Sequence, residues 1–133
     1  MREKKERTPL LDVQGLSVSF SMYDKGLRKK DLEVLHKLSL GVYPGEILAV
    51  VGSSGSGKSI LAHAVMGILP GNASVKGEIH YRGEQLDEKR QEALRGKEIA
   101  FIPQSLAYLD PLMRVDRQVI GIRGTKEKQE AAF

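Results

Sequence analysis

Apolar and polar residues alternate in three stretches of the chain, with the period of two that is typical of strands with one buried face. In the first stretch, Val18 and Phe20 alternate with serines. In the second, residues 38, 40 and 42 are apolar and their neighbours are polar or small, and the third covers residues 75–81. The first two are predicted to be half-buried strands of an antiparallel sheet, and the third to be another alternating strand.

Two shorter runs, residues 47–51 and 98–102, are almost entirely apolar. Continuous apolar runs of this length are typical of strands that are covered on both faces. Between the first two alternating strands, residues 21–33 are charged and contain Gly26, which predicts a loop. Pro44 followed by Gly45 predicts a turn.

Helical spacing follows the first apolar run. Residues 59–69 carry apolar side chains at positions 60, 61, 64, 65, 68 and 69, which share one face of a helix. Pro70 and Gly71 are expected to end this helix. A short polar helix is predicted over residues 88–95. Strands and helices that alternate in this way indicate an α/β protein.

Composition and charge add few constraints. The 133 residues make about one domain and include no cysteine, so disulfides and thiolate metal sites are excluded. No run approaches the roughly 18 apolar residues of a membrane-spanning helix. The net charge is +4, from 21 basic and 17 acidic residues.

Much of the basic excess lies in Arg28, Lys29, Lys30 and the two tails. It is interpreted as solvated charge of loops and tails, and weak attraction to an anionic membrane surface or to nucleic acid is the alternative. Aromatic residues do not interleave with the basic ones, so a nucleic-acid partner is not expected.

The segment between the first apolar run and the first helix indicates a specific chemistry. It reads GSSGSGKS and consists of Gly52, Ser53, Ser54, Gly55, Ser56, Gly57, Lys58 and Ser59. Two glycines separated by four residues and followed by lysine and serine, between a strand and a helix, match the phosphate-binding loop. A flexible glycine-serine linker is the alternative, but a linker has no reason to carry Lys-Ser at this position.

Each residue type has a physical role at such a site. Glycines let the backbone curl so that successive N–H groups point at phosphate oxygens. The start of the helix, at Ser59 and Ile60, adds the positive end of its dipole. Lys58 can reach the β- and γ-phosphates, and the Ser59 hydroxyl can bind Mg²⁺. The sequence therefore predicts nucleotide binding.

Features of two other phosphate-loop classes do not match. A guanine-binding motif needs an aspartate where residues 125–128 read TKEK. The pattern from Asp12 to Gly15 precedes the loop, which is the wrong order for a GTPase switch. Fifty-one residues precede the loop, whereas small kinases usually begin with the strand that leads into it.

The chain resembles a known family in four stretches. These read LDVQGLSVSF, LHKLSLGVYPGEILAVVGSSGSGKSILAHAVMGILP, VKGEIHYRGEQL and RGKEIAFIPQSLAYLDPLMRVDRQVIG. They are similar to the N-terminal half of ATP-binding cassette (ABC) transporter ATPases, and most similar to the oligopeptide, dipeptide and nickel uptake ATPases. The Pro-Gly-Glu turn before the loop and the glutamine after Ile102 make the resemblance specific.

The resemblance implies a fold and a domain organisation. The fold is a partial P-loop NTPase core of α/β class with an N-terminal antiparallel β-subdomain. This partial ATP-binding domain is expected over residues 10–123, between polar tails at residues 1–9 and 124–133.

The resemblance also implies cofactors and further site residues. ATP and Mg²⁺ are the expected cofactors. Phe20 matches the position of an aromatic residue that stacks on adenine, and Tyr23 is a nearby substitute. The alternative for Phe20 is a role as a core residue. Gln104 matches a glutamine that contacts Mg²⁺ and the attacking water, with a solvated loop residue as the alternative.

Other motifs of the family do not occur in residues 105–133. These are the Leu-Ser-Gly-Gly-Gln signature, a buried strand that ends in Asp-Glu, and the switch histidine. Asp110 and Asp116 are not interpreted as substitutes, because neither ends an apolar strand. No catalytic residue is therefore assigned, ATP hydrolysis stays open, and the apolar runs at 47–51 and 99–102 are expected to be incompletely covered.

The function implied is that of the ATP-binding subunit of an importer for peptides or nickel. Such a subunit lies peripherally on the cytoplasmic face of the cell membrane, with transmembrane permease subunits and a second ATP-binding subunit as partners. A non-transport ABC ATPase of DNA repair or translation is one alternative, which binding to a permease subunit would exclude. A non-functional truncated gene product is another, which failure to bind ATP would support.

Overall fold

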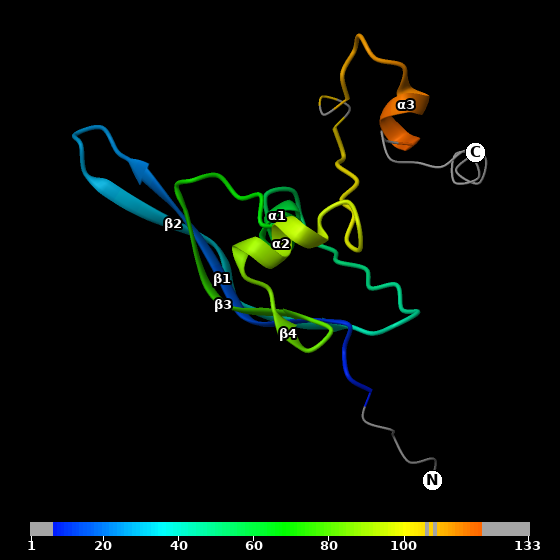
Figure 1. Ribbon diagram of the computed structural model, residues 1–133. Coiled ribbons are helices and arrows are strands. Elements are labelled where there is room, and N and C mark those ends of the chain that lie inside the picture. Colours follow the sequence, from blue (N-terminus) through cyan, green and yellow to red (C-terminus); the bar gives the residue numbers. More distant parts are fainter. Residues whose placement is uncertain (1–6, 106, 108, 121–133) are drawn as a thin grey trace. The chain divides into compact units, whose positions relative to one another are not determined.

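The computed structural model describes residues 7–105, 107 and 109–120 (Figure 1). The contacts within the chain divide it into two compact units, Met1–Phe101 and Ile102–Phe133. The tail predicted at residues 124–133 lies outside the described residues, as does most of the tail predicted at residues 1–9. The first unit contains a sheet and two helices, and it includes the phosphate-loop sequence.

The sheet of the first unit is antiparallel throughout. Its strands are β1 (Leu11–Tyr23), β2 (Lys29–Val42), β3 (Ala73–Tyr81) and β4 (Glu84–Gln85), in the order β2-β1-β3-β4. The alternation predicted for the first two stretches is confirmed, because Val18 is buried and residues 38, 40 and 42 are half-buried while Lys37 and Ser39 are exposed. In the third stretch Ile79 and Tyr81 are buried, but Val75 is 49% exposed. Local side-chain pattern was therefore enough to assign the buried face of β1 and β2.

A bulge in β1 sets which residues reach the core. The pairing of β1 shifts between Val13 and Leu16, around Gly15 at φ +58°. Val13, Leu16 and Val18 all become fully buried as a result, although their spacing is uneven. Gly77 of β3 passes close to the bulge, where a Cβ would lie 2.5 Å from the carbonyl oxygen of Gly15.

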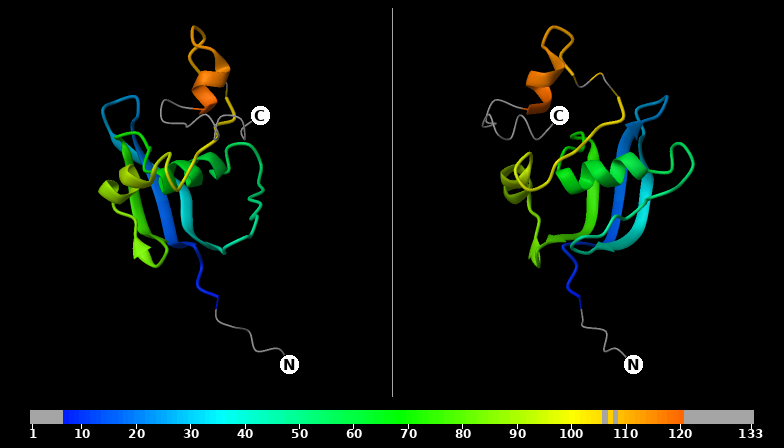
Figure 2. Two further views of the ribbon diagram at one scale, coloured as in Figure 1. Left: turned by 45° about the vertical axis from the view of Figure 1, so that its right-hand side comes forward. Right: turned by 90° about the vertical axis from the view of Figure 1, so that its right-hand side faces the viewer.

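Helices α1 (Lys58–Met66) and α2 (Glu88–Leu94) lie over the same face of the sheet (Figure 2). The core that they enclose consists of Val13, Leu16, Val18, Leu35, Leu61, Ala64, Ile79, Tyr81 and Leu86. All but Leu86 come from the sheet or from α1. The position of the loop that begins α1 is thus determined by packing of α1 on the sheet.

Helix α1 ends one turn earlier than predicted. Gly67 adopts φ +68° and donates its N–H to Ala64 O, while Ile68 donates to His63 O. This pair of bonds is a Schellman motif, which satisfies the last carbonyls and closes the helix. Pro70 and Gly71 therefore follow a helix that has already ended.

The short helix predicted over residues 88–95 is confirmed as α2. The carboxylate of Asp87 caps it by accepting the N–H of Arg90 at 2.8 Å. The Gln91 side chain then donates to the carbonyl oxygens of Ala64 and Val65, at 2.9 and 3.1 Å. One side chain of α2 thus satisfies carbonyl groups at the end of α1.

The loop predicted at residues 21–33 is wrong for most of its length. Strands β1 and β2 continue as a two-stranded ribbon, and only residues 24–28 form the turn. Ser21 also donates its hydroxyl to the Asp31 carboxylate at 2.6 Å across the ribbon. The polar side chains misled the prediction, because a ribbon exposed on both faces needs no apolar face to keep its backbone hydrogen bonds.

The two buried strands predicted at residues 47–51 and 98–102 are also wrong. Residues 47–51 run as an extended segment, and within the described part of the chain no strand pairs with them. Ile47 is 96% exposed and Val51 is 89% exposed. Residues 98–102 form only an isolated parallel bridge, between Ile99 and Arg95. Apolar sequence favours a buried strand, but a strand also needs a neighbour for its backbone groups.

The second unit contains α3 (Val115–Ile120), which the sequence pattern did not predict. Gln118 ties this helix to the preceding turn: it accepts the N–H of Asp110 at 2.7 Å and donates to the carbonyl oxygens of Asp110 and Met113. Asp116 forms an ion pair with Arg114 at 2.7 Å. None of the helices in the described ranges has the length and apolar character needed to cross a membrane.

Candidate functional site

The GSSGSGKS loop connects the extended segment at residues 47–51 to α1. Gly57 is the N-cap of α1, at φ +91°, and no side chain caps this end of the helix. The first turn also contains no acidic residue. Because the first N–H groups of a helix have no intrahelical partner, this end presents free donors and a positive dipole, which is the arrangement that binds an anion.

Lys58 points back over the loop from the first position of α1. Its Nζ donates to the carbonyl oxygens of Gly52 and Ser53, at 2.5 and 2.7 Å, and to Ser56 Oγ at 3.2 Å. The three acceptors are neutral. A phosphate oxygen forms a stronger, charge-assisted hydrogen bond with an ammonium group. Lys58 would therefore form stronger hydrogen bonds if an anionic ligand replaced these neutral partners.

Gly57 brings the loop into contact with β2, a contact that sequence reasoning missed. A Cβ at this position would lie 2.7 Å from Leu35 Cδ2 and 3.2 Å from Val34 Cγ1. Gly57 is itself buried, whereas residues 52–56 are exposed. Glycine is therefore needed at residue 57 for close packing as well as for its backbone angle. Only the tertiary fold brings β2 to this glycine.

Ser59 and Ile60 follow Lys58 in the first turn of α1. Ile60 packs against the core, whereas Ser59 is exposed. No group of three metal-binding side chains occurs in the part of the chain that the structure describes. A magnesium ion at this site would take the Ser59 hydroxyl together with phosphate oxygens and water, a mixture of ligands that Mg²⁺ favours. The residues present thus fit a magnesium nucleotide.

The aromatic residues proposed for adenine lie on β1. Phe20 is half-buried and packs against the core, which agrees with its alternative interpretation as a core residue. Tyr23 is 75% exposed at the end of the strand. Stacking on adenine stays a prediction for both residues.

Gln104 lies in an exposed bend of the second unit. The structure does not position the second unit relative to the loop, so contact between Gln104 and Mg²⁺ stays a prediction. Asp110 and Asp116 are engaged in the local bonds that hold α3 to its turn.

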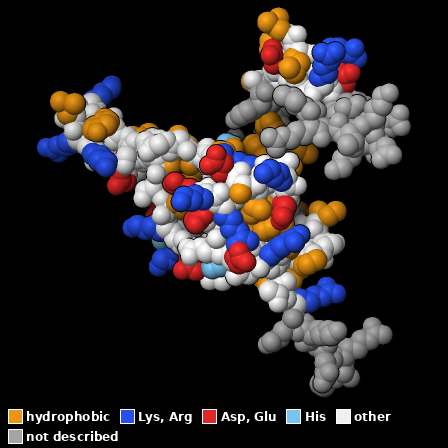
Figure 3. Space-filling model, viewed as in Figure 1, with side chains coloured by type: hydrophobic (Ala, Val, Ile, Leu, Met, Phe, Trp, Pro, Cys, Tyr) orange, Lys and Arg blue, Asp and Glu red, His pale blue; other side chains and the backbone are white. Residues whose placement is uncertain are grey.

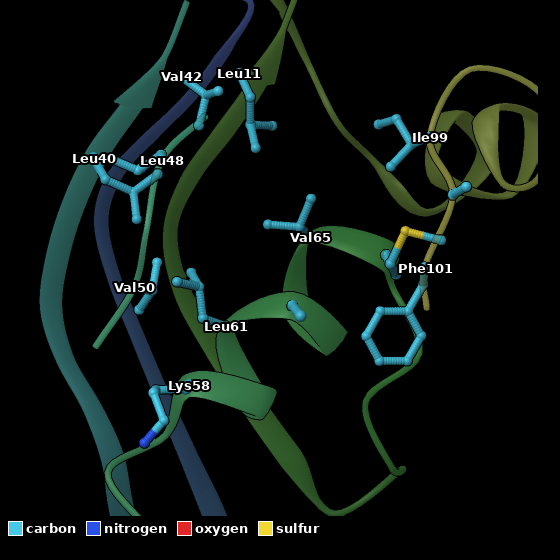
Figure 4. Close-up of a pocket in the computed structure, with 13 residues that line it drawn as sticks. Leu11, Leu40, Val42, Leu48, Val50, Lys58, Leu61, Val65, Ile99 and Phe101 are labelled. Atoms are coloured by element: carbon cyan, nitrogen blue, oxygen red, sulfur yellow. The ribbon is translucent and has the colours of Figure 1, made fainter. Parts of the chain in front are cut away.

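An apolar cavity of about 400 Å³ lies behind the loop (Figure 4). Leu40, Leu48, Val50, Leu61 and Val65 line it from the sheet, the extended segment and α1, and Lys58 closes one end. Because every lining residue except Lys58 is apolar, the cavity suits hydrophobic side chains better than a nucleotide.

Phe101 lines the same cavity at the end of the first unit. Its ring makes an edge-to-face contact with His63 of α1, with centroids 5.3 Å apart and an interplanar angle of 80°. The helix that carries Lys58 is therefore in contact with the residue three positions before Gln104. No local sequence pattern predicted this contact.

Comparison with known proteins assigns the family. Residues 35–133 match the family model described as ABC transporter. The chain belongs to this family. Membership of this family implies nucleotide binding.

Individual relatives of this ABC protein agree with the family match. It is 35% identical to the oligopeptide transport ATP-binding protein OppD of Bacillus subtilis, over 94% of this chain and 36% of the relative. It is 35% identical to the dipeptide transport ATP-binding protein DppD of Lactococcus lactis, over 83% and 32%. It is 36% identical to OppD of Escherichia coli, over 85% and 33%. The chain thus spans about a third of the length of the curated relatives that it matches.

Proposed function

We propose that this chain is the ATP-binding part of an ABC importer ATPase and that it binds MgATP through residues 52–59. The observation that carries the proposal is the uncapped start of α1, where Lys58 is held over a glycine loop by neutral acceptors only. The loop amides and Lys58 would hold the phosphates, and Ser59 would bind the metal. Mg²⁺ would neutralise charge on the β- and γ-phosphates.

The transport role rests on the relatives. Those named above are called oligopeptide or dipeptide transport ATP-binding proteins, which favours peptides over nickel as the imported substrate. The proposed partners are transmembrane permease subunits and a second ATP-binding subunit, on the cytoplasmic face of the membrane. Within this proposal the fold is a partial P-loop core with an antiparallel β-subdomain, Gln104 contacts Mg²⁺, and Phe20 or Tyr23 contacts adenine.

The proposal is tested by titrating the full chain with MgATP and measuring the heat of binding. Lys58→Ala is expected to weaken binding by at least about tenfold, because a hydrogen bond to a charged group contributes roughly 1.5–3 kcal/mol. Lys89→Ala, which removes an exposed lysine from α2, is the matched control and should leave the affinity unchanged. Circular dichroism of each variant confirms that the fold is kept.

Two outcomes would refute the proposal. One is that the unmodified, folded chain does not bind MgATP, which would support a non-functional product instead. The other is that Lys58→Ala and Lys89→Ala bind MgATP equally well. Ser59→Ala adds a test of the metal, since it should reduce the gain in affinity that Mg²⁺ gives over ATP in EDTA.

A further inference from the structure

The end of the β1–β2 hairpin projects beyond the rest of the sheet (Figure 1). Pairing of β1 with β3 stops at Phe20 and Ala73, whereas pairing with β2 continues through Tyr23 and Lys29. Residues 22–30, called the hairpin tip below, are therefore part of a ribbon without a third strand. Every residue of the tip is exposed.

The tip is strongly cationic. It contains Lys25, Arg28, Lys29 and Lys30 against one carboxylate, Asp24. The next carboxylate along the chain, Asp31, accepts the Ser21 hydroxyl. Prevention of edge-to-edge pairing with other sheets is by itself a sufficient explanation for lysines on an exposed ribbon. Charge alone therefore does not indicate a partner.

Apolar side chains occur at the same end of the hairpin. Leu27, in the turn between the strands, is 90% exposed, Tyr23 is 75% exposed and Met22 is 49% exposed. Figure 3 shows hydrophobic and basic side chains together at this projecting end. Protection of a strand edge would explain the lysines, but it would not explain a leucine held in water at the apex.

Leu27 is also in an unfavourable backbone conformation. Its φ is +61°, in the left-handed region, which is costly for a leucine. Its N–H donates to Asp24 O at 3.2 Å, and Asp24 N–H donates to Arg28 O at 3.0 Å, so a hydrogen-bonded turn holds Leu27 at the apex. Neither the core nor the turn geometry gains from leucine at this position.

An apolar apex surrounded by cations matches the interface of an anionic bilayer. Basic residues are attracted to anionic headgroups, tyrosine favours the membrane–water interface, and an apolar side chain gains by entering the acyl boundary. Nucleic acid would use the cations but would give no role to Leu27. We propose that the hairpin tip docks on an anionic lipid surface, with Leu27 inserted and the four cationic side chains at the headgroups.

The test is flotation of the full chain, without nucleotide, with vesicles of phosphatidylcholine alone or mixed with phosphatidylglycerol. The chain should bind the mixed vesicles and not the neutral ones. Lys25→Gln with Arg28→Gln is expected to weaken partitioning about 25-fold, or about fivefold for each charge. Leu27→Ser should weaken it about tenfold, because the apolar insertion is lost.

The matched control is Lys89→Gln with Lys97→Gln, which removes two charges outside the tip and should leave binding within a few-fold. Equal losses in the control and the tip variant would show general attraction by net charge and overturn the proposal. So would unchanged binding by Leu27→Ser, or binding to a mixed-sequence DNA duplex but not to vesicles. Because no nucleotide is present, failure here is distinct from failure of the ATP-binding proposal.

Discussion

At the scale of single residues, the glycines of the loop are alike in sequence but not in their surroundings. Gly55 has φ +79° and would have open space around a Cβ, whereas a Cβ on Gly57 would meet β2 at 2.7 Å. The motif predicted that both positions need a flexible backbone, and positive φ at both confirms it. It could not predict which glycine touches the sheet, because that contact joins residues 22 positions apart, Gly57 and Leu35.

Replacing these two glycines by alanine should therefore have unequal effects. Gly55→Ala is expected to lower the free energy of unfolding by about 1 kcal/mol, the cost of a left-handed backbone. Gly57→Ala adds the cost of overpacking and should lose about 3 kcal/mol in total. Urea denaturation at low temperature, followed by circular dichroism, measures both. Equal losses would show that Gly57 does not pack against β2 as the structure has it.

At the scale of elements, the sequence predicted the starts of both helices to within one residue, but it predicted the end of α1 three residues too late. Helix α1 ends at Gly67 because its N–H and that of Ile68 close the last turn, and because Gln91 supplies further donors to the carbonyls there. Pro70 would end a helix, but it lies beyond the residue at which α1 has already ended. Side-chain bonds from another helix do not follow any local pattern, so they could not be predicted from sequence.

The bridge between the two helices can be tested with Gln91→Ala. The change leaves two carbonyl oxygens of α1 without these donors, and it is expected to lower the free energy of unfolding by about 1–2 kcal/mol. Glu92→Ala removes the neighbouring exposed side chain and should stay within about 0.5 kcal/mol of the unmodified chain. Thermal unfolding of the two variants measures this difference. Similar midpoints would mean that Gln91 contributes no more to stability than a surface residue does.

At the scale of the whole molecule, the main feature is incomplete burial around the phosphate loop. Ile47 and Val51 are exposed, and Leu48 and Val50 face a cavity of about 400 Å³ in place of packed side chains. The expectation from sequence that residues 47–51 are incompletely covered is confirmed. For residues 99–102 the same expectation is confirmed only in part, because Ile99 packs against the core while Ile102 is 91% exposed.

Incomplete burial predicts marginal stability for the pure monomer. Exposed apolar surface and an unfilled cavity both reduce the hydrophobic contribution to folding. Thermal unfolding should be broad and occur at low temperature, and the folded chain should bind the apolar dye ANS. A sharp transition at high temperature without dye binding would contradict this prediction.

The sequence by itself predicted the chemistry of the loop and determined the buried faces of β1 and β2. Both depend on neighbouring residues: the spacing of glycine, lysine and serine in GSSGSGKS, and the alternation around Val18 and Leu40. Only the tertiary structure decided which residues pair, where α1 ends, that the hairpin continues to Tyr23, and that residues 47–51 stay unpaired. Strand pairing and burial are contacts between distant segments, and the backbone groups of an apolar run stay unpaired until another segment supplies partners.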